Sequence, residues 1–167
     1  MYRDNKIGLT IPAYNEERLI GPTLDAIPDI IDMVYVVNDC STDSTADVVR
    51  ERAAKDPRII LVNHETNQGV GQGIITGYQR ASIDQCDLCV VTGGDHQMPM
   101  EQIPALLDPL VEGKADYSKG NRFLMPDDGL DDMPWSRMLP NAMISFMTKM
   151  ASGYYKIFDV VDGFTAI

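Results

Sequence analysis

Basic residues are scarce in this sequence, and it has no long apolar run. Its 14 Lys and Arg residues stand against 25 Asp and Glu, which gives a formal net charge of −11. Nucleic-acid binding depends on basic side chains that release counterions from phosphates, so this balance argues against a DNA or RNA partner. No stretch approaches the ~20 consecutive apolar residues that cross a bilayer. We therefore expect a soluble chain.

Cysteine is scarce as well, with only Cys40, Cys86 and Cys89 in the chain. Three cysteines cannot pair completely, and no basic flank with an apolar core begins the chain, so a reducing, cytoplasmic setting is predicted. Cys86 and Cys89 have CxxC spacing, but no second pair would complete a tetrahedral zinc site. We interpret both as structural.

The size of the chain predicts one domain. At 167 residues, 44% of them hydrophobic, a compact domain can bury roughly two-thirds of the surface of the unfolded chain. No repeat or low-complexity tract divides it, so a single domain over residues 1–167 is predicted. Residues 163–167 resemble the middle of a strand or turn, so we expect this chain to be a piece of a longer protein, truncated at its C-terminus.

Short apolar runs alternate four times with segments of helical periodicity. The runs lie at 7–11, 33–37, 59–62 and 88–91, and the helical segments at 16–27, 46–53, 74–81 and 103–110. The runs do not alternate strictly with polar residues, which is typical of parallel strands buried on both faces. The predicted fold is therefore α/β, with a Rossmann-like, doubly wound, mostly parallel sheet and helices on both faces. A fifth strand is predicted at 115–118 and a mobile loop at 125–135.

Polar or glycine residues follow each predicted strand. They are residues 13–17, 38–41, 63 with 67–73, and 93–97. Ligands of open parallel sheets bind beyond the carboxyl ends of the strands, where these loops meet. Ordinary loop polarity and helix capping explain any single loop equally well. However, Asp39 and Asp95 each end an apolar run, and two carboxylates at one sheet edge repel unless a cation or a donor-rich ligand lies between them.

Three motifs occur in a specific order: Ile11–Glu17 (IPAYNEE), Val36–Thr45 (VVNDCSTDST) and Asn67–Gly71 (NQGVG). Together they resemble the donor-binding half of the family-2 glycosyltransferases, which have the GT-A fold. The resemblance covers nearly the whole chain. Residues 119–123 (KGNRF), with Phe158-Asp159 and Asp162-Gly163-Phe164, resemble the branch that contains dolichyl-phosphate mannose and glucose synthases.

The resemblance implies roles for particular residues. Asp39 would accept hydrogen bonds from the edge of a uracil or guanine base. Asp95 would hold a divalent cation, Mg²⁺ or Mn²⁺, on the diphosphate. Arg122, near the phosphates or the acceptor, and Asp162 would join Asp95 as catalytic residues. The nucleotide-sugar pocket would be formed by Pro12, Ala13, Tyr14, Glu16, Asp39, Asn67, Gly69, Gly94 and Asp95.

The metal motif departs from the family pattern. The family has Asp-x-Asp, whereas this chain has Gly93-Gly94-Asp95, so one carboxylate is missing. Mg²⁺ needs only one or two protein carboxylates when phosphates and waters complete its octahedron. Asp95 with the Gln97 carbonyl would then suffice, and binding should depend strongly on the nucleotide. His96 alternates away from both residues on an extended segment, so we do not expect it to be a ligand.

The implied reaction is an inverting transfer of a hexose from a UDP- or GDP-sugar. In the resembling branch the acceptor is a polyprenyl phosphate, dolichyl or undecaprenyl, and the reaction would occur at the cytoplasmic face of the membrane. A saccharide acceptor is the alternative, and its hydroxyl would need a carboxylate base. Asp159 and Asp162 are candidates for that base, although turn capping explains them more simply.

Two other readings stay open. A sugar nucleotidyltransferase usually has a glycine-rich, basic loop after its first strand, whereas residues 12–17 are acidic. A nucleotide-sugar-binding module with impaired catalysis would also fit the loss of an aspartate at position 93. The glycines at 69, 71 and 73 are a weak phosphate-binding signal, because no P-loop Lys-Ser/Thr follows them. His64 has no evident partner, and no role is assigned to it.

A helix is predicted at 141–155, with large apolar residues on one face. This stripe is most often a core face, but it is also typical of a helix in a membrane interface, where it would bring the domain to the lipid surface. Its members are Met143, Phe146, Met147, Met150 and Tyr154.

Overall fold

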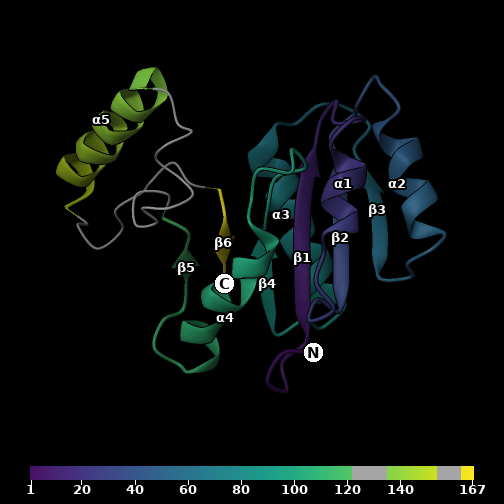
Figure 1. Cartoon of the computed structure of the whole chain (residues 1–167), viewed down its shortest axis with the longest axis horizontal. Coiled ribbons are helices and arrows are strands. Elements are labelled where there is room, and N and C mark those ends of the chain that lie inside the picture. The colour runs from purple at the N-terminus through teal and green to yellow at the C-terminus, as the bar shows by residue number, and fades with distance from the viewer. Residues whose placement is uncertain (122–134, 154–162) are drawn as a thin grey trace.

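A computed structural model describes residues 1–121, 135–153 and 163–167 of the chain. Strands and helices alternate through the first two-thirds of the sequence, as the apolar runs predict (Figure 1). The elements are β1 (Ile7–Ala13), α1 (Ile20–Asp25), β2 (Met33–Asn38), α2 (Thr45–Ala53), β3 (Ile59–Asn63), α3 (Val70–Ile83), β4 (Leu88–Val91), the 3₁₀ turn η1 (Met100–Gln102), α4 (Ile103–Val111), β5 (Ser118–Lys119), α5 (Trp135–Ser152) and β6 (Thr165–Ala166).

The strands form one sheet in the order β3-β2-β1-β4-β6-β5. Strands β1 to β4 pair in parallel, whereas β6 runs antiparallel to both β4 and β5. This confirms the predicted mostly parallel sheet. Strands β2 and β3 follow on one side of β1, whereas β4 lies on its other side. In open parallel sheets this change of direction places a crevice beyond the carboxyl ends of the two strands, here β1 and β4.

The predicted fifth strand is displaced along the chain. It occupies Ser118–Lys119 rather than 115–118, because the backbone N–H groups of Lys114 and Ala115 donate to the Pro109 carbonyl and complete the turn after α4. Pairing with Thr165 and Ala166 then fixes β5. The segment at 163–167, interpreted as the middle of a strand or turn, does contain β6.

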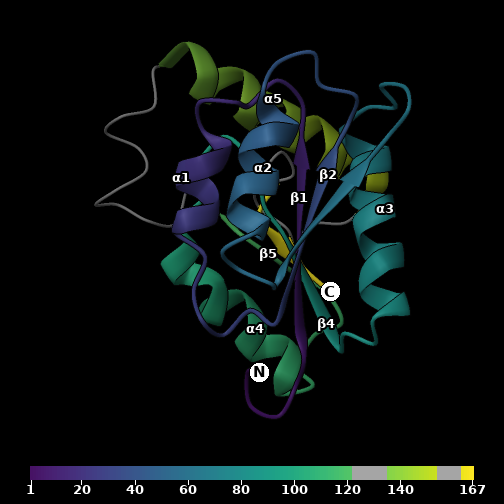
Figure 2. The same ribbon diagram turned by 90° about the vertical axis from the view of Figure 1, so that its right-hand side faces the viewer.

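Helices cover both faces of the sheet (Figure 2). Side chains alternate along a strand, so Ile7, Leu9 and Ile11 of β1 face the larger core, which contains side chains of α1, α2 and α4. The opposite face packs against α3, where Tyr35 and Cys89 form a second cluster with Ala81. The doubly wound architecture is therefore confirmed.

Helix α5 lies beyond the β5 edge of the sheet (Figure 1). It begins at Trp135, earlier than the predicted helix at 141–155, and it ends at Ser152. Gly153 follows with φ +67°, a left-handed conformation that commonly terminates helices. The loop predicted at 125–135 falls almost entirely outside the described residues. None of the helices in the described parts of the chain is long and apolar enough to cross a membrane.

Candidate functional site

The carboxyl ends of β1, β2, β3 and β4 bring the predicted site residues to one edge of the sheet. The parallel register pairs Ala13 with Asn38 and Asn38 with Asn63, so these strands end at the same level. A hydrogen bond of 2.9 Å from Asn38 Nδ2 to Asn63 Oδ1 links two of the ends. The loops after these strands, with the polar residues that the sequence singled out, therefore converge.

The Asp39 side chain is bonded to three donors of the protein at this edge. Its side chain is 5% exposed. The Oδ1 atom lies 2.7 Å from Nδ1 of His64 and accepts a hydrogen bond of 2.9 Å from the Gln68 N–H. The Oδ2 atom accepts one of 2.7 Å from the Gly69 N–H. Asp39 thus holds the loop that leads into α3.

His64 has partners on both sides, which corrects the interpretation from the sequence that it has none. Its side chain is 7% exposed, and its Nε2 atom lies 3.0 Å from the Thr76 hydroxyl on α3. An ionised carboxylate only accepts hydrogen bonds, so Nδ1 carries the proton that is shared with Asp39. The imidazole therefore connects the end of β2 to the middle of α3.

The local environment keeps Asp39 ionised. Burial raises the pKa of its carboxyl, but the hydrogen bonds from Gln68, His64 and Gly69 outweigh burial and hold the pKa below its ordinary value. The carboxylate also sits at the N-terminal end of α3, where the helix dipole favours negative charge. Gly69 begins this turn with φ +84°, a conformation that favours glycine.

The loops after β1 and β2 are joined by hydrogen bonds between the first and second motifs. Asn15 Oδ1 accepts a hydrogen bond of 2.9 Å from the Thr42 N–H, and the Glu16 N–H donates to Thr45 Oγ1 at 2.8 Å. Asn15 adopts φ +56° to make this turn. The loop is thereby fixed from within the protein, and the Tyr14 side chain is left 48% exposed at its surface.

The loop after β4 carries Asp95, which accepts a long hydrogen bond of 3.4 Å from the Gln97 N–H. The backbone of Gly94 is fixed to α1, because Thr23 Oγ1 donates a hydrogen bond of 3.1 Å to the Gly94 carbonyl. A Cβ atom at Gly93 would lie 2.8 Å from Asp95 Oδ1, so the Asp95 carboxylate already occupies the space beside the position where the family has its first aspartate. His96 adopts φ +55° and lines a surface hollow with Gln97 and Met98.

Carboxylates from separate loops come close together at this edge. Burial, followed by the negative charges of Asp95 and Asp43, raises the pKa of Glu16. Asp95, Gln97 and the nearby Glu16 carry oxygen atoms of the kind that could bind Mg²⁺ or Mn²⁺. The described residues contain no group of three or more His, Cys, Asp or Glu side chains that could hold a metal. The donor set thus fits a cation that takes its other ligands from a bound phosphate and from water.

The remaining predicted binding residues lie around these groups. Pro12 is half-buried, whereas Ala13 and Gly94 are buried and Asn67 is exposed. Arg122, Asp159 and Asp162 lie outside the described residues, so the structure does not place them.

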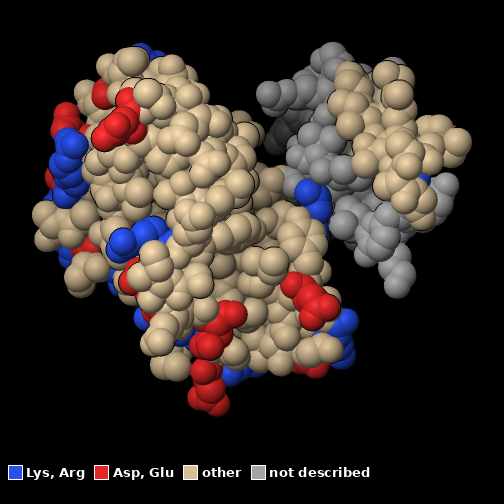
Figure 3. Space-filling view, turned by 180° about the vertical axis from the view of Figure 1, so that it is seen from behind, with Lys and Arg blue, Asp and Glu red and all other residues tan. Residues whose placement is uncertain are grey.

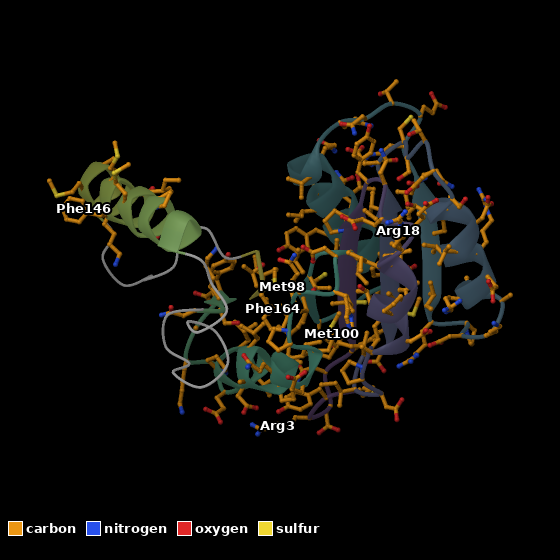
Figure 4. The ribbon with its side chains drawn as sticks, turned by 45° about the horizontal axis from the view of Figure 1, so that its top comes forward. Arg3, Arg18, Met98, Met100, Phe146 and Phe164 are labelled. Atoms are coloured by element: carbon orange, nitrogen blue, oxygen red, sulfur yellow. The ribbon has the colours of Figure 1, made fainter. Side chains whose placement is uncertain are left out.

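Helix α5 presents apolar side chains to the outside, and the expectation that its stripe forms a core is wrong for the described members. Met143, Phe146, Met147 and Met150 are 59–63% exposed, whereas Ser145 is buried. Phe146 points away from the sheet (Figure 4). Met98, Met100 and Phe164 instead lie against the sheet, on the side of β6. The described part of α5 has a mainly uncharged surface when seen from behind (Figure 3). Tyr154 lies outside the described residues.

Comparison with known proteins identifies the family. The family model of glycosyl transferase family 2 matches residues 9–167. A UDP-N-acetylglucosamine–dolichyl-phosphate N-acetylglucosaminyltransferase from Methanococcus voltae is 29% identical over 165 residues, which cover 91% of this chain and 65% of the relative. The chain spans about 60 to 65% of the length of the curated relatives that head the comparison.

Solved structures share the fold. A mannosyltransferase from Pyrobaculum calidifontis, in complex with GDP-Man and Mn²⁺, matches with a TM-score of 0.53 and 29% identity over 60% of this chain and 30% of that one. Glucosyl-3-phosphoglycerate synthase from Mycobacterium tuberculosis, in complex with Mn²⁺, UDP and phosphoglyceric acid, matches with a TM-score of 0.71 and 19% identity over 98% of this chain and 55% of that one. The fold is GT-A, as the motifs predict.

Proposed function

The chain belongs to glycosyl transferase family 2, and on this premise we propose that it transfers a hexose from a UDP- or GDP-sugar to a polyprenyl phosphate with inversion at the anomeric carbon. The observation that carries the proposal is the convergence of four polar loops at the carboxyl ends of β1 to β4. The acceptor class is supported by the relative from Methanococcus voltae, which by its name acts on dolichyl phosphate.

The nucleotide is proposed to bind between the loops after β1, β2 and β3. Pro12, Ala13, Tyr14 and Glu16 would form one wall, with the exposed Tyr14 ring available to pack against a base or sugar. Asn67 and Gly69 would form the opposite wall, and Asp39 at its base would accept a hydrogen bond from the nucleobase. Hydrogen bonds to the loop after β2 hold both walls in place, the first through Asn15 and Glu16 and the second through Asp39.

Asp95 and Gln97 are proposed to hold the divalent cation, with Gly94 close to the diphosphate. A bound Mg²⁺ or Mn²⁺ neutralises negative charge on the departing nucleoside diphosphate. The protein contributes few ligands, so cation and nucleotide are expected to bind together. The proximity of Glu16 to Asp95 adds negative charge that favours the cation.

The acceptor determines whether the protein must remove a proton. A polyprenyl phosphate oxygen is ionised at pH 7, so it can attack the anomeric carbon without a general base. Arg122 is proposed to neutralise the phosphates or to orient the acceptor. If the acceptor were a saccharide hydroxyl, Asp162 would be the proposed base.

The exposed apolar face of α5 supports the proposal that the protein acts at a lipid surface. Exposed Met and Phe side chains on one helical face are typical of helices that lie in a membrane interface. We therefore propose that the domain is peripheral to a membrane, and that the reaction occurs at its cytoplasmic face.

The proposal is tested by a transfer assay in lipid vesicles. The protein, Mn²⁺ and a radiolabelled UDP- or GDP-hexose are incubated with vesicles that contain dolichyl or undecaprenyl phosphate, and label is measured in the organic extract. Label that requires both polyprenyl phosphate and Mn²⁺ supports the proposal. Transfer only to added saccharides would show that the acceptor is a saccharide and not a polyprenyl phosphate. Nucleotide binding without any transfer would indicate a binding module with impaired catalysis.

A further inference from the structure

We propose that Thr23 of α1 is a positioning residue for the divalent cation, because its hydroxyl fixes the backbone that carries Asp95. The inference rests on the proposed function, in which Asp95 and Gln97 hold the cation. It adds a residue that lies outside every motif of the sequence and that would act on the cation only through the loop after β4.

The loop after β4 is attached to the rest of the protein at very few points. Thr92 makes the last backbone hydrogen bond to β1, of 3.1 Å. Among the hydrogen bonds between described residues, only the one from Thr23 Oγ1 to the Gly94 carbonyl joins residues 93–98 to another element. Two successive glycines, Gly93 and Gly94, also give this backbone wide conformational freedom. The place of the loop therefore depends strongly on Thr23.

The Thr23 hydroxyl is buried and is directed at the loop from α1. Thr23 is 0% exposed, and its Oγ1 atom lies 2.9 Å from the Leu19 carbonyl and 3.1 Å from the Gly94 carbonyl. The Leu19 carbonyl also accepts the Thr23 N–H, at 3.0 Å, whereas the Gly94 carbonyl has no second donor in the described part of the chain. Gly94 is buried, so without the hydroxyl its carbonyl finds another donor only if the loop moves.

The Gly94 backbone in turn determines where the Asp95 carboxylate lies. A Cβ atom at Gly94 would lie 3.3 Å from Ile20 Cδ1 and 3.5 Å from Glu16 Cγ, so this residue is packed against α1 and the loop after β1. A Cβ atom at Gly93 would lie 2.8 Å from Asp95 Oδ1, so the carboxylate rests against the backbone of the same two glycines. If Gly94 shifts away from α1, Asp95 moves with it.

A displacement of Asp95 matters because the chain has a carboxylate at position 95 and none at position 93. Mg²⁺ accepts its ligands only near ideal octahedral geometry, and few protein ligands are present to compensate for one that has moved. Groups that orient a metal ligand without touching the metal typically contribute about 10–100-fold to metal affinity. We therefore expect the Thr23 hydroxyl to contribute about tenfold to the nucleotide affinity that the cation supplies.

The test measures the Mn²⁺ gain, which is the ratio of the nucleotide dissociation constants without and with Mn²⁺. Calorimetry gives both constants for UDP or GDP, whichever the wild type binds. Thr23→Val keeps the size of the side chain but removes the hydroxyl, so it should lower the gain about tenfold. Thr23→Ser keeps the hydroxyl and should retain the gain. The affinity without Mn²⁺ should be the same in all these proteins.

Thr10→Val is the matched control. Thr10 is as buried as Thr23, but its hydroxyl lies 3.4 Å from Cys89 Sγ, on the face of the sheet that α3 covers. The same chemical change is thus made away from the loop, and the Mn²⁺ gain should be retained. Each gain is a ratio from one preparation, so a general loss of folded protein cancels. If Thr23→Val does not fold, Thr23→Ala also removes the hydroxyl and gives the same comparison.

An undiminished Mn²⁺ gain in the variant without the hydroxyl would overturn the inference. An equal loss in Thr23→Ser would overturn it too, since that variant still has a hydroxyl. Either result leaves the proposed function intact, provided that Asp95→Ala abolishes the gain and the wild type transfers hexose. If the wild type shows no gain from Mn²⁺ and transfers no hexose, the proposed function fails and the inference fails with it.

Discussion

Gly77 of α3 packs directly against Thr10 of β1. A Cβ atom at position 77 would overlap the Cβ, Cγ2 and Oγ1 atoms of Thr10, so the helix reaches this distance from the sheet only because residue 77 has no side chain. One turn earlier, a Cβ atom at Gly73 would lie 2.9 Å from Pro12 Cβ. Gly73 and Gly77 therefore set how closely α3 covers the sheet, and Gly73 does so beside the candidate site.

The first prediction concerns this contact. Gly77→Ala should lower the free energy of unfolding by about 1–3 kcal/mol, because the added methyl group forces α3 away from β1. Gly71→Ala is the matched control, since nothing lies within 4 Å of a Cβ atom there and alanine favours the helix by about 0.5–1 kcal/mol. Urea unfolding measures both, and equal effects of the two substitutions would show that the contact is unimportant.

The second prediction concerns the cation. Asp95→Ala should abolish the Mn²⁺-dependent part of UDP or GDP affinity, because it removes the carboxylate proposed to bind the metal, while the melting temperature stays near that of the wild type. Asp47→Ala is a suitable control, since Asp47 lies on the exposed face of α2 and pairs with Arg50. Calorimetric titration with and without Mn²⁺ gives the result. Retained metal-dependent affinity in Asp95→Ala would remove this residue from the site.

The third prediction concerns acid stability. The pKa of Asp39 is raised by burial but held below its ordinary value of 3.8 by three hydrogen bonds. The unfolded chain therefore takes up the proton first as the pH falls, so the stabilisation is present above the ordinary pKa and is lost as the pH falls through the lowered one. Asp39→Asn cannot titrate, and its unfolding free energy should fall less steeply between about pH 5 and pH 2. Parallel curves for the two proteins would argue against this linkage.

The fourth prediction concerns the thiols. Burial raises the pKa of the Cys89 thiol to about 11 and also raises that of Cys86, so both should be poorly reactive at pH 8. Cys40 lies in the loop after β2 and is half-buried. Dithionitrobenzoate should therefore label one thiol rapidly in the folded wild type and almost none in Cys40→Ser, whereas all thiols should react in denaturant. Rapid labelling of the folded Cys40→Ser variant would contradict the raised pKa values of the other two thiols.

The fifth prediction concerns the apolar face of α5. Replacing Phe146 and Met147 together by serine should reduce binding to uncharged lipid vesicles several-fold, because it removes apolar surface that would enter the interface. Ile83→Ser on α3 is the control, since that side chain is 68% exposed on a different helix. Vesicle co-sedimentation measures both variants. Undiminished binding of the double variant would exclude this face as the contact.

The fold was predictable because its strands have a strong local signal. The runs at 7–11 and 33–37 are apolar throughout, and the helices between them have clear periodicity. Strand β5 was misplaced because two residues leave no pattern, and only its pairing with Thr165 and Ala166 defines it. The exposure of Phe146 was not predictable, since the spacing of apolar residues is the same for a core helix and an interfacial one.

The site was predictable only in part. Loops after parallel strands must meet, so the grouping of Glu16, Asp39 and Asp95 follows from topology. The contact of His64 with Asp39 and Thr76 joins residues that are distant in sequence, and no periodicity marks it. A polar residue one position past the end of β3 was the only available signal, and it is common in such loops.

The placement of β6 has a consequence for how the protein is made. Cys89 and Ile167 exchange both of their backbone hydrogen bonds, at 2.8 and 3.1 Å, and β5 joins the sheet only through β6. Until the last residues of β6 leave the ribosome, β4 is therefore the open flank of the nascent sheet. An unpaired flank of this kind can pair with another chain, so slow synthesis of the segment between β5 and β6 should favour aggregation, and a chaperone that shields β4 should suppress it.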